Sequence, residues 1–198
     1  MNTPIVNLHG KLSNARKALR TTAIIMMATL AIPTAMTGCA KLFHPGGEKF
    51  VIPKADDAHD QADIAQQQYR AAAQSVDGEV KKKEFRKAVA ALTEVEKNFP
   101  QDKVYTPPCR LLKADVLYKL EDYGAAERQY RDVITAYPDI PDVHSGALYG
   151  LGEALTKDGH AREGKEAYRQ LLDTYKTSTD SAVKERVKRA EVKYKQIV

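Results

Sequence analysis

The chain has 198 residues, of which 43% are hydrophobic, so it is long enough for one domain with a buried core plus appendages. Apolar and polar residues do not alternate over any useful length, which excludes a large half-buried sheet and favours an all-helical domain. The formal net charge is +5, but four of the 31 basic residues precede residue 39, where no acid occurs. The other 27 nearly balance the 26 acids, which argues against a nucleic-acid partner.

The N-terminus has the layout of a secretory signal. Residues 1–20 are polar and carry only positive charge, and residues 21–37 are apolar or small and uncharged. This order predicts a signal peptide over residues 1–38 that is cut from the mature chain. The alternative is a permanent membrane span, but the uncharged run is interrupted by Pro33 and is shorter than the roughly 20 residues that a span usually needs.

The residues at the expected cut, Met36-Thr37-Gly38-Cys39, resemble the lipobox of bacterial lipoproteins. The resemblance implies that the sulfur of Cys39 receives a diacylglyceryl group and that the new amine is acylated, for example with palmitate. Two or more acyl chains anchor a protein stably, whereas one gives marginal membrane binding. By analogy with enterobacterial sorting, Ala40 permits transfer to the outer membrane, so we expect a lipid-anchored envelope protein that faces the periplasm. The other interpretation is that Cys39 is an ordinary residue near a signal cut.

Residues 39–55 are expected to be a flexible, lipidated tether, because they contain Pro45-Gly46-Gly47 and Pro53 and show no sustained period. Helices follow from the capping cluster at Asp56–Asp60 onward. The first has an apolar side formed by Ile64, Tyr69, Ala72, Ala73 and Val76. Later helices are predicted at about 79–99, 109–120, 123–137, 143–156, 160–176 and 181–196, with Pro107-Pro108 in the linker before the helix at 109.

An internal repeat organises residues 56–198. Apolar or small residues stand at Tyr123, Ala126, Tyr130, Val133 and Tyr137, steps of three and four that share one helix face. The same pattern recurs thirty-eight residues earlier, from Phe85 to Phe99, and thirty-eight residues later, from Ala161 to Tyr175. Such a period predicts an all-α solenoid of about three helical hairpins, closed by a polar C-terminal capping helix.

The hairpin at 148–175 resembles the tetratricopeptide repeat (TPR). Its first helix matches at Leu148, Leu151, Gly152 and Leu155, and Gly159 matches the turn glycine. In the hairpin before it, Arg110 and Lys113 stand where apolar residues are usual. In the first hairpin only the second helix matches the pattern. The first helix of that hairpin is expected to be displaced by about four residues. A lipobox, a tether and TPRs together resemble periplasmic lipoproteins of the BamD type, which belong to the outer-membrane β-barrel assembly machine. They also resemble the repeat domain of the Tol–Pal-associated protein YbgF.

The resemblance implies a concave surface, lined by the first helices of the hairpins, that binds a peptide of another envelope protein. Mapped position by position, the candidate partner-binding residues are Leu111, Asp115, Tyr118, Lys119, Tyr149, Glu153, Thr156 and Lys157. Aromatic side chains with both signs of charge suit a peptide with a few anchors. The alternative is that these are ordinary solvated residues.

The sequence shows no catalytic constellation, metal site or cofactor motif. His59 stands among Asp56, Asp57, Asp60 and Asp63, a pattern more typical of an acidic helix start than of a metal site. Cys109 would lack an intramolecular partner if Cys39 is lipidated, and its place next to a helix start could lower its pKa. Packing as a small apolar residue is the favoured role for Cys109, and a Cys109-dependent enzyme or enzyme accessory is the remote alternative. We therefore expect a non-catalytic scaffold, acting in outer-membrane assembly or, alternatively, as a Tol–Pal or cell-division coordinator.

Overall fold

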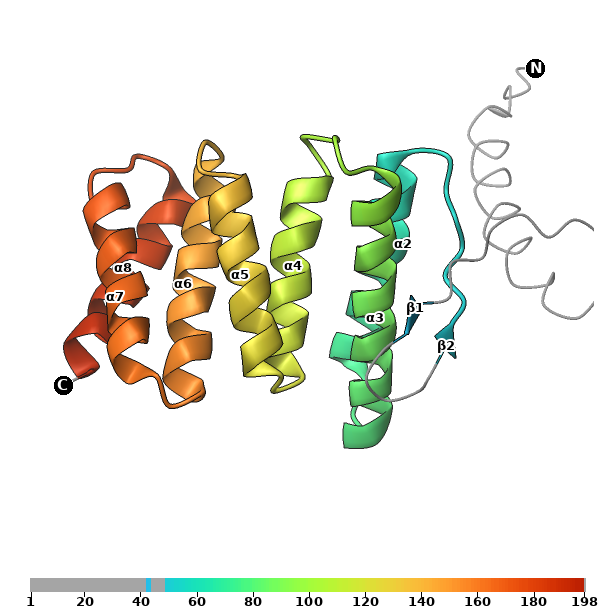
Figure 1. Ribbon diagram of the computed structural model, residues 1–198, viewed down its shortest axis with the longest axis horizontal. Helices are drawn as coiled ribbons and strands as arrows, with labels where there is room; N and C mark the ends of the chain where they lie inside the picture. Colours follow the sequence, from blue (N-terminus) through green and yellow to red (C-terminus); the bar gives the residue numbers. More distant parts are fainter. Residues whose placement is uncertain (1–41, 44–48, 198) are drawn as a thin grey trace, which may run out of the picture. The chain divides into compact units, whose positions relative to one another are not determined.

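The computed structural model describes residues 42–43 and 49–197 (Figure 1). The predicted signal peptide and Cys39 lie outside the described residues. Two short strands, β1 (Leu42–Phe43) and β2 (Lys49–Phe50), pair antiparallel, with Leu42 opposite Phe50. The helices that follow in the described part are α2 (Ala58–Gln74), α3 (Gly78–Asn98), α4 (Thr106–Lys119), α5 (Tyr123–Ala136), α6 (Pro141–Lys157), α7 (Ala161–Tyr175) and α8 (Ser181–Gln196).

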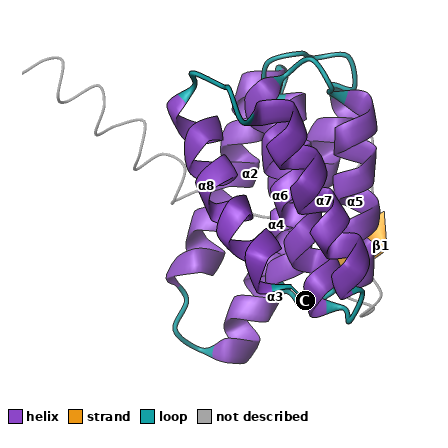
Figure 2. Cartoon of the chain, turned by 90° about the vertical axis from the view of Figure 1, so that its left-hand side faces the viewer, coloured by secondary structure: helices purple, strands orange, loops and turns teal. Residues whose placement is uncertain are grey.

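The predicted all-α solenoid of three helical hairpins and a C-terminal helix is confirmed. Each helix packs against the next one in the chain, and the first helices of successive hairpins also contact one another, as in the pairs α4–α6 and α6–α8. Figure 2 shows this stack from the side of α7 and α8. Helix α8 therefore occupies the place that the first helix of a fourth hairpin would take, and its surface joins the row formed by α2, α4 and α6.

The helices begin where the sequence offers caps. Aspartates at 57, 77, 122 and 180 each accept a hydrogen bond from a backbone N–H of the first turn of α2, α3, α5 and α8. Helix α4 begins at Thr106, three residues before the expected start, and thus includes Pro107 and Pro108. The prediction of a proline linker was wrong because the first turn of a helix has no use for the N–H that proline lacks.

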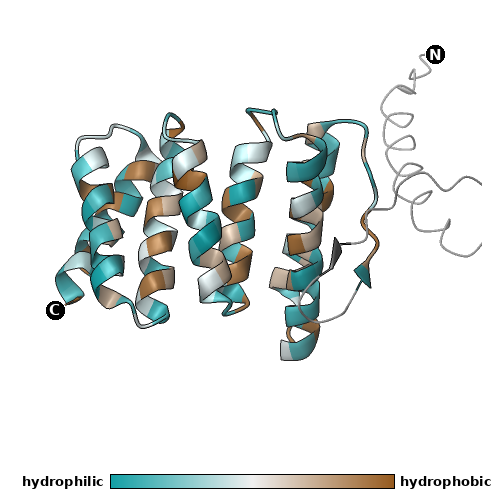
Figure 3. Cartoon of the chain, in the orientation of Figure 1, coloured by the Kyte–Doolittle hydropathy of each residue, from teal (hydrophilic) through white to brown (hydrophobic). Residues whose placement is uncertain are grey.

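The thirty-eight-residue period is confirmed in the burial of the second helices. Leu92, Tyr130 and Tyr168 are each at most 2% exposed and occupy equivalent places in α3, α5 and α7. Figure 3 shows hydrophobic and hydrophilic segments alternating along these helices, as expected when one face packs and the other meets water. The aromatic residues that close the pattern, Phe99, Tyr137 and Tyr175, are all half-buried.

The turns inside the later hairpins repeat as well. Glu121 (φ 64°) and Gly159 (φ 89°) stand thirty-eight residues apart and both adopt the left-handed conformation that ends a helix. The next backbone N–H closes each turn: Asp122 donates to Leu117 O (3.1 Å) and His160 donates to Leu155 O (2.8 Å). Glycine adopts this conformation without a Cβ penalty, whereas glutamate does not.

The first hairpin departs from the register by more than expected. Helix α2 ends at Gln74, seven residues before the position equivalent to the end of α4, whereas the expected displacement of this first helix was about four. Helix α3 likewise begins at Gly78, seven residues before the position equivalent to the start of α5. Seven residues are close to two helical turns, so the added segment keeps its apolar face on the same side.

The predicted apolar side of the first helix needs a correction. Helix α2 ends at Gln74, so Val76 lies in the turn and is 99% exposed; Ala73 is exposed as well. Of the predicted residues, Ala72 is fully buried and Tyr69 packs against the core, and Ala58, Ala62 and Ala65 complete the buried face.

The last residues of the predicted tether contact the repeat domain. The fully buried amide of Gln61 accepts a hydrogen bond from Ala55 N (3.0 Å) and donates one to Pro53 O (3.1 Å), while Ile52 packs against the core of α2, α3 and α4. The stretch predicted as tether therefore includes residues that α2 holds in place. None of the described helices is both long and apolar enough to cross a membrane.

The two residues that depart from the TPR pattern find polar and aromatic partners. Lys113 pairs with Glu96 of the neighbouring helix at 3.2 Å, and the guanidinium of Arg110 lies over the ring of Tyr137, 5.8 Å from its centre. A charged head with an aliphatic stem can thus cover apolar surface at these positions.

Candidate functional site

Two buried tyrosines connect the outer helices to the surface formed by α4 and α6. The Tyr130 hydroxyl donates to Asp115 Oδ1 and the Tyr168 hydroxyl donates to Glu153 Oε1, both at 2.6 Å. The two pairs are thirty-eight residues apart and are thus equivalent in successive hairpins. Each hydroxyl holds a carboxylate in a fixed position on the row of first helices.

Glycines make room for these rings. A Cβ at Gly150 would lie 2.3 Å from Cζ of Tyr130, and a Cβ at Gly152 would lie 2.5 Å from Cε1 of Tyr168. In the first hairpin Leu92 takes the place of Tyr130, and in α4 Leu112 takes the place of Gly150. The pair of a large tyrosine and a glycine is therefore replaced by two leucines of medium size in the core between α2, α3 and α4.

A cavity of about 410 Å³ opens on this surface between α2, α4, α6 and α8. It brings together six of the eight predicted partner-binding residues: Leu111, Asp115, Tyr118, Lys119, Tyr149 and Glu153. The other two, Thr156 and Lys157, line a separate cavity of about 220 Å³ with Glu153 and the end of α8. Thr156 donates its hydroxyl to Gly152 O (2.7 Å) within its own helix, so it has a structural partner.

Sequence reasoning missed the contributions of α2 and α8. Tyr69 of α2 and both Arg186 and Arg189 of α8 line the larger cavity. The signal for α8 was present, because Ala190 stands thirty-eight residues after Gly152 and is likewise fully buried. Continuing the period would have marked α8 as a first helix, but the equivalents of Tyr149 and Glu153 in it are Val187 and Glu191, so the period did not predict the two arginines.

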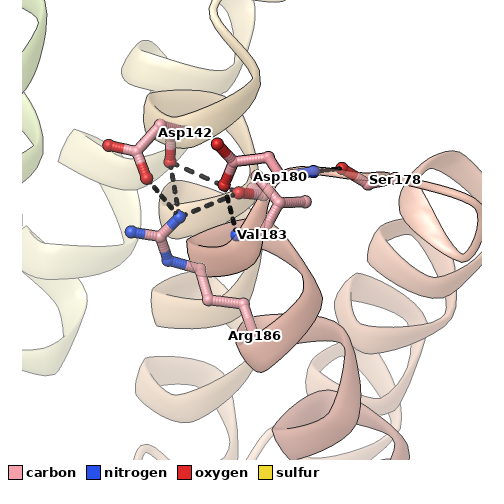
Figure 4. A network of polar contacts seen from close by, with 6 residues as sticks. Asp142, Ser178, Asp180, Val183 and Arg186 are labelled. Atoms are coloured by element: carbon pink, nitrogen blue, oxygen red, sulfur yellow. Dashed lines mark hydrogen bonds and ion pairs between the residues drawn. The ribbon is translucent and has the colours of Figure 1, made fainter.

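Arg186 fastens α8 to the start of α6. Its Nη1 donates to the carbonyl oxygen of Asp142 (3.0 Å), to Oδ1 of Asp142 (2.6 Å) and to Oγ of Ser145 (3.2 Å). Figure 4 shows this contact beside the capping group of α8, where Asp180 accepts from Val183 N (2.9 Å). Helix α8 is thus a fixed wall of the cavity.

Hydrogen bonding and burial act in opposite directions on the two carboxylates of the cavity. Burial raises the pKa of Asp115, and the hydrogen bond from Tyr130 only partly offsets this effect. Burial also opposes ionisation of Glu153, but hydrogen bonds from Tyr168 and Lys193 outweigh it and lower the pKa of Glu153. Lys193 Nζ lies 3.0 Å from Glu153 Oε1, so this charge is neutralised within the protein.

This geometry agrees with one comparison to known proteins. Residues 146–178 match the family model described as the tetratricopeptide repeat. The match covers most of α6, the turn at Gly159 and all of α7. Together with the shared period of the other hairpins, it supports a TPR-type solenoid. No curated protein matches the chain.

Within the described part of the chain, two exposed groups of side chains have the composition of metal ligands. One combines Asp57, His59 and Asp60 at the start of α2, where Asp57 already caps the helix and His59 contacts Asp60 at 3.2 Å. The predicted members Asp56 and Asp63 are not part of this group. The other combines Glu127, Asp158 and His160, but Glu127 pairs with Arg131 at 2.9 Å. Helix capping and ion pairing thus account for much of both groups.

Cys109 packs inside the core between α2, α3 and α4 and is only 3% exposed. The expectation that a helix start could lower its pKa was wrong, since burial in apolar surroundings, followed by the nearby charges of Glu96 and Asp102, raises the pKa to about 12. The thiol is therefore protonated at neutral pH, which is unsuited to a nucleophile.

Proposed function

We propose that this protein is a non-catalytic, lipid-anchored scaffold of the bacterial cell envelope that binds another envelope protein through its TPR-type surface. The process that we favour is assembly of outer-membrane β-barrel proteins. The observation that carries the proposal is the cavity between α2, α4, α6 and α8, where aromatic side chains stand beside charges of both signs. Such a surface offers pockets for the large anchors and polar partners for the rim of a docked peptide.

Rigid support of the cavity favours binding over a purely structural role. Tyr130 holds Asp115, Tyr168 holds Glu153, and Arg186 holds α8 against α6. Side chains that are already held in one geometry lose less conformational entropy when a partner docks.

The envelope location is part of the proposal and rests on the order of residues 1–39. A basic segment, an uncharged apolar run and the sequence Met36-Thr37-Gly38-Cys39 together fit export followed by lipidation. Replacement of Cys39 by Ala is expected to move the protein from the membrane fraction to the soluble fraction of the native cells. Continued retention would indicate that residues 21–37 remain as a membrane span, and the lipid anchor would have to be abandoned.

Site-specific crosslinking tests the partner. A photoreactive amino acid at Tyr149, on the cavity, is compared in intact native cells with the same residue at Arg128, which is exposed on α5 and outside the cavity. We expect an adduct with a β-barrel assembly protein from position 149 only. An adduct with a Tol–Pal or division protein would favour the coordinator role instead, and equal or absent adducts at both positions would refute a partner site in this cavity.

A further inference from the structure

The carboxylates of the cavity are already engaged inside the protein. Asp115 accepts from Tyr130, and Glu153 accepts from Tyr168 and pairs with Lys193. Each acid therefore offers a cationic side chain of a partner only the acceptor positions that these internal bonds leave free, and Lys193 already neutralises Glu153.

Two cations of the same cavity, Lys119 and Arg189, are less completely satisfied than Arg186, which donates to Asp142 and Ser145. Lys119 is exposed at the end of α4, and Arg189 lies over the ring of Tyr149, 4.6 Å from its centre, while donating to the Tyr149 hydroxyl at 3.1 Å. Among the ion pairs of the described residues, those that reach this cavity join Arg186 to Asp142 and Lys193 to Glu153, and none includes Lys119 or Arg189. The charge of Lys119 acts on Asp115 and that of Arg189 acts on Glu153, but neither cation has a carboxylate in direct contact, so a partner carboxylate can pair with either at short range.

Apolar and aromatic groups lie in the same cavity as these charges. Leu111, Tyr118 and Tyr149 are all half-buried and line it. Stacking of Arg189 on Tyr149 holds the guanidinium in place and leaves its remaining N–H groups for a carboxylate. An aromatic or aliphatic side chain of a partner can bury itself here while an adjacent carboxylate meets Lys119 or Arg189.

We propose that the cavity selects a protein segment in which an aspartate or glutamate stands next to an aromatic or large aliphatic residue, with Lys119 and Arg189 as the residues that determine this specificity. The inference rests on the proposed function, since it names the chemistry of the partner at the same site. A protein segment fits better than a nucleic acid, because two cations in one cavity can pair with one or two carboxylates but cannot neutralise a continuous chain of phosphates.

Peptide selection on the full-length protein tests this assignment. A library of random dodecapeptides displayed on phage is selected against the wild type, against the double variant Lys119→Glu/Arg189→Glu, and against the control Arg128→Glu/Lys184→Glu. The control makes the same charge change at two exposed residues outside the cavity. Circular dichroism and thermal unfolding establish that each variant is folded; if the double variant is not, the exposed single change Lys119→Glu replaces it.

We expect acidic residues next to aromatic or aliphatic ones to be enriched on the wild type and on the control. A selected peptide should bind the double variant at least about tenfold more weakly, since loss of one charge pair across an interface commonly has this effect or more. Peptides that require Tyr149 but show no acidic preference would overturn the inference and leave the proposed function standing. If no selected peptide loses binding on Tyr149→Ala, both fall, and tighter binding of a polyuridine oligonucleotide than of any peptide would overturn the inference as well.

Discussion

Replacement of Gly150 by alanine tests whether the Tyr130 ring really sets the distance between neighbouring hairpins. The added Cβ would lie 2.3 Å from Cζ, 2.4 Å from Cε1 and 2.7 Å from the hydroxyl oxygen of Tyr130. Real carbon atoms do not approach so closely. The ring cannot easily withdraw, because it is only 2% exposed and its hydroxyl is hydrogen-bonded to Asp115 at 2.6 Å.

The expected loss of stability follows from two opposing effects. Forcing extra volume into a packed core costs about 1–3 kcal/mol, and a rigid ring at this distance indicates the upper part of that range. Glycine-to-alanine changes in a helix interior return about 1 kcal/mol. We therefore expect a net destabilisation of about 2 kcal/mol. The control Gly124→Ala meets nothing closer than Arg128 Nη1 at 3.8 Å and should be neutral or stabilise by up to about 1 kcal/mol.

Urea unfolding followed by circular dichroism measures both changes, as a shift of the midpoint at constant slope. The first hairpin suggests a compensating change, since Leu92 and Leu112 occupy the places of Tyr130 and Gly150. In the variant Tyr130→Leu/Gly150→Ala the clash is relieved, so the double-mutant cycle should show a favourable coupling of at least about 1 kcal/mol. A Gly150→Ala protein as stable as Gly124→Ala, or a cycle without coupling, would refute this account of the packing.

Three further predictions concern single positions. Glu121→Gly should stabilise the protein by about 1 kcal/mol, because glycine adopts φ 64° without strain, and an unchanged urea midpoint would contradict this. Cys109 should react with a thiol reagent at pH 8 only after unfolding, since it is buried and its pKa is raised to about 12; labelling of the native protein at the rate of the unfolded chain would be incompatible with that burial. Burial lowers the pKa of His144, so the unfolded state binds a proton at this side chain more readily than the folded state does. The contribution of His144 to the free energy of unfolding is therefore complete above pH 6.5 and decreases as the pH falls below that value. Stability measured across this range should therefore depend less on pH in His144→Asn than in the wild type.

Most of the candidate site was predictable from the repeat. Leu111, Asp115 and Tyr118 in α4, with Tyr149 and Glu153 in α6, line one cavity because equivalent positions of successive hairpins face the same surface. Thr156 and Lys157 failed to join them although the same mapping selected both. They stand at the end of α6, where the adjoining wall is formed by the C-terminal part of α8 and encloses a different cavity.

The sequence by itself determined the number, type and order of the helices. Their signals are local: apolar residues at steps of three and four define a buried face, and Asp57, Asp77, Asp122 and Asp180 cap the helix starts. These signals act within a few residues and repeat every thirty-eight residues. They can therefore be recognised in the sequence without knowing which helices pack against one another.

Only the tertiary structure decided how the hairpins meet and what α8 contributes. Tyr130 reaches back to Asp115 and across to Gly150, and Arg186 joins α8 to Asp142, through contacts between helices whose relative rotation no local pattern specifies. The same rotation brings Arg189 onto Tyr149 and so places a positive charge on the aromatic wall of the cavity. Periodicity therefore predicts which side of each helix is buried, whereas the docking of one helix against the next decides which side chains share a site.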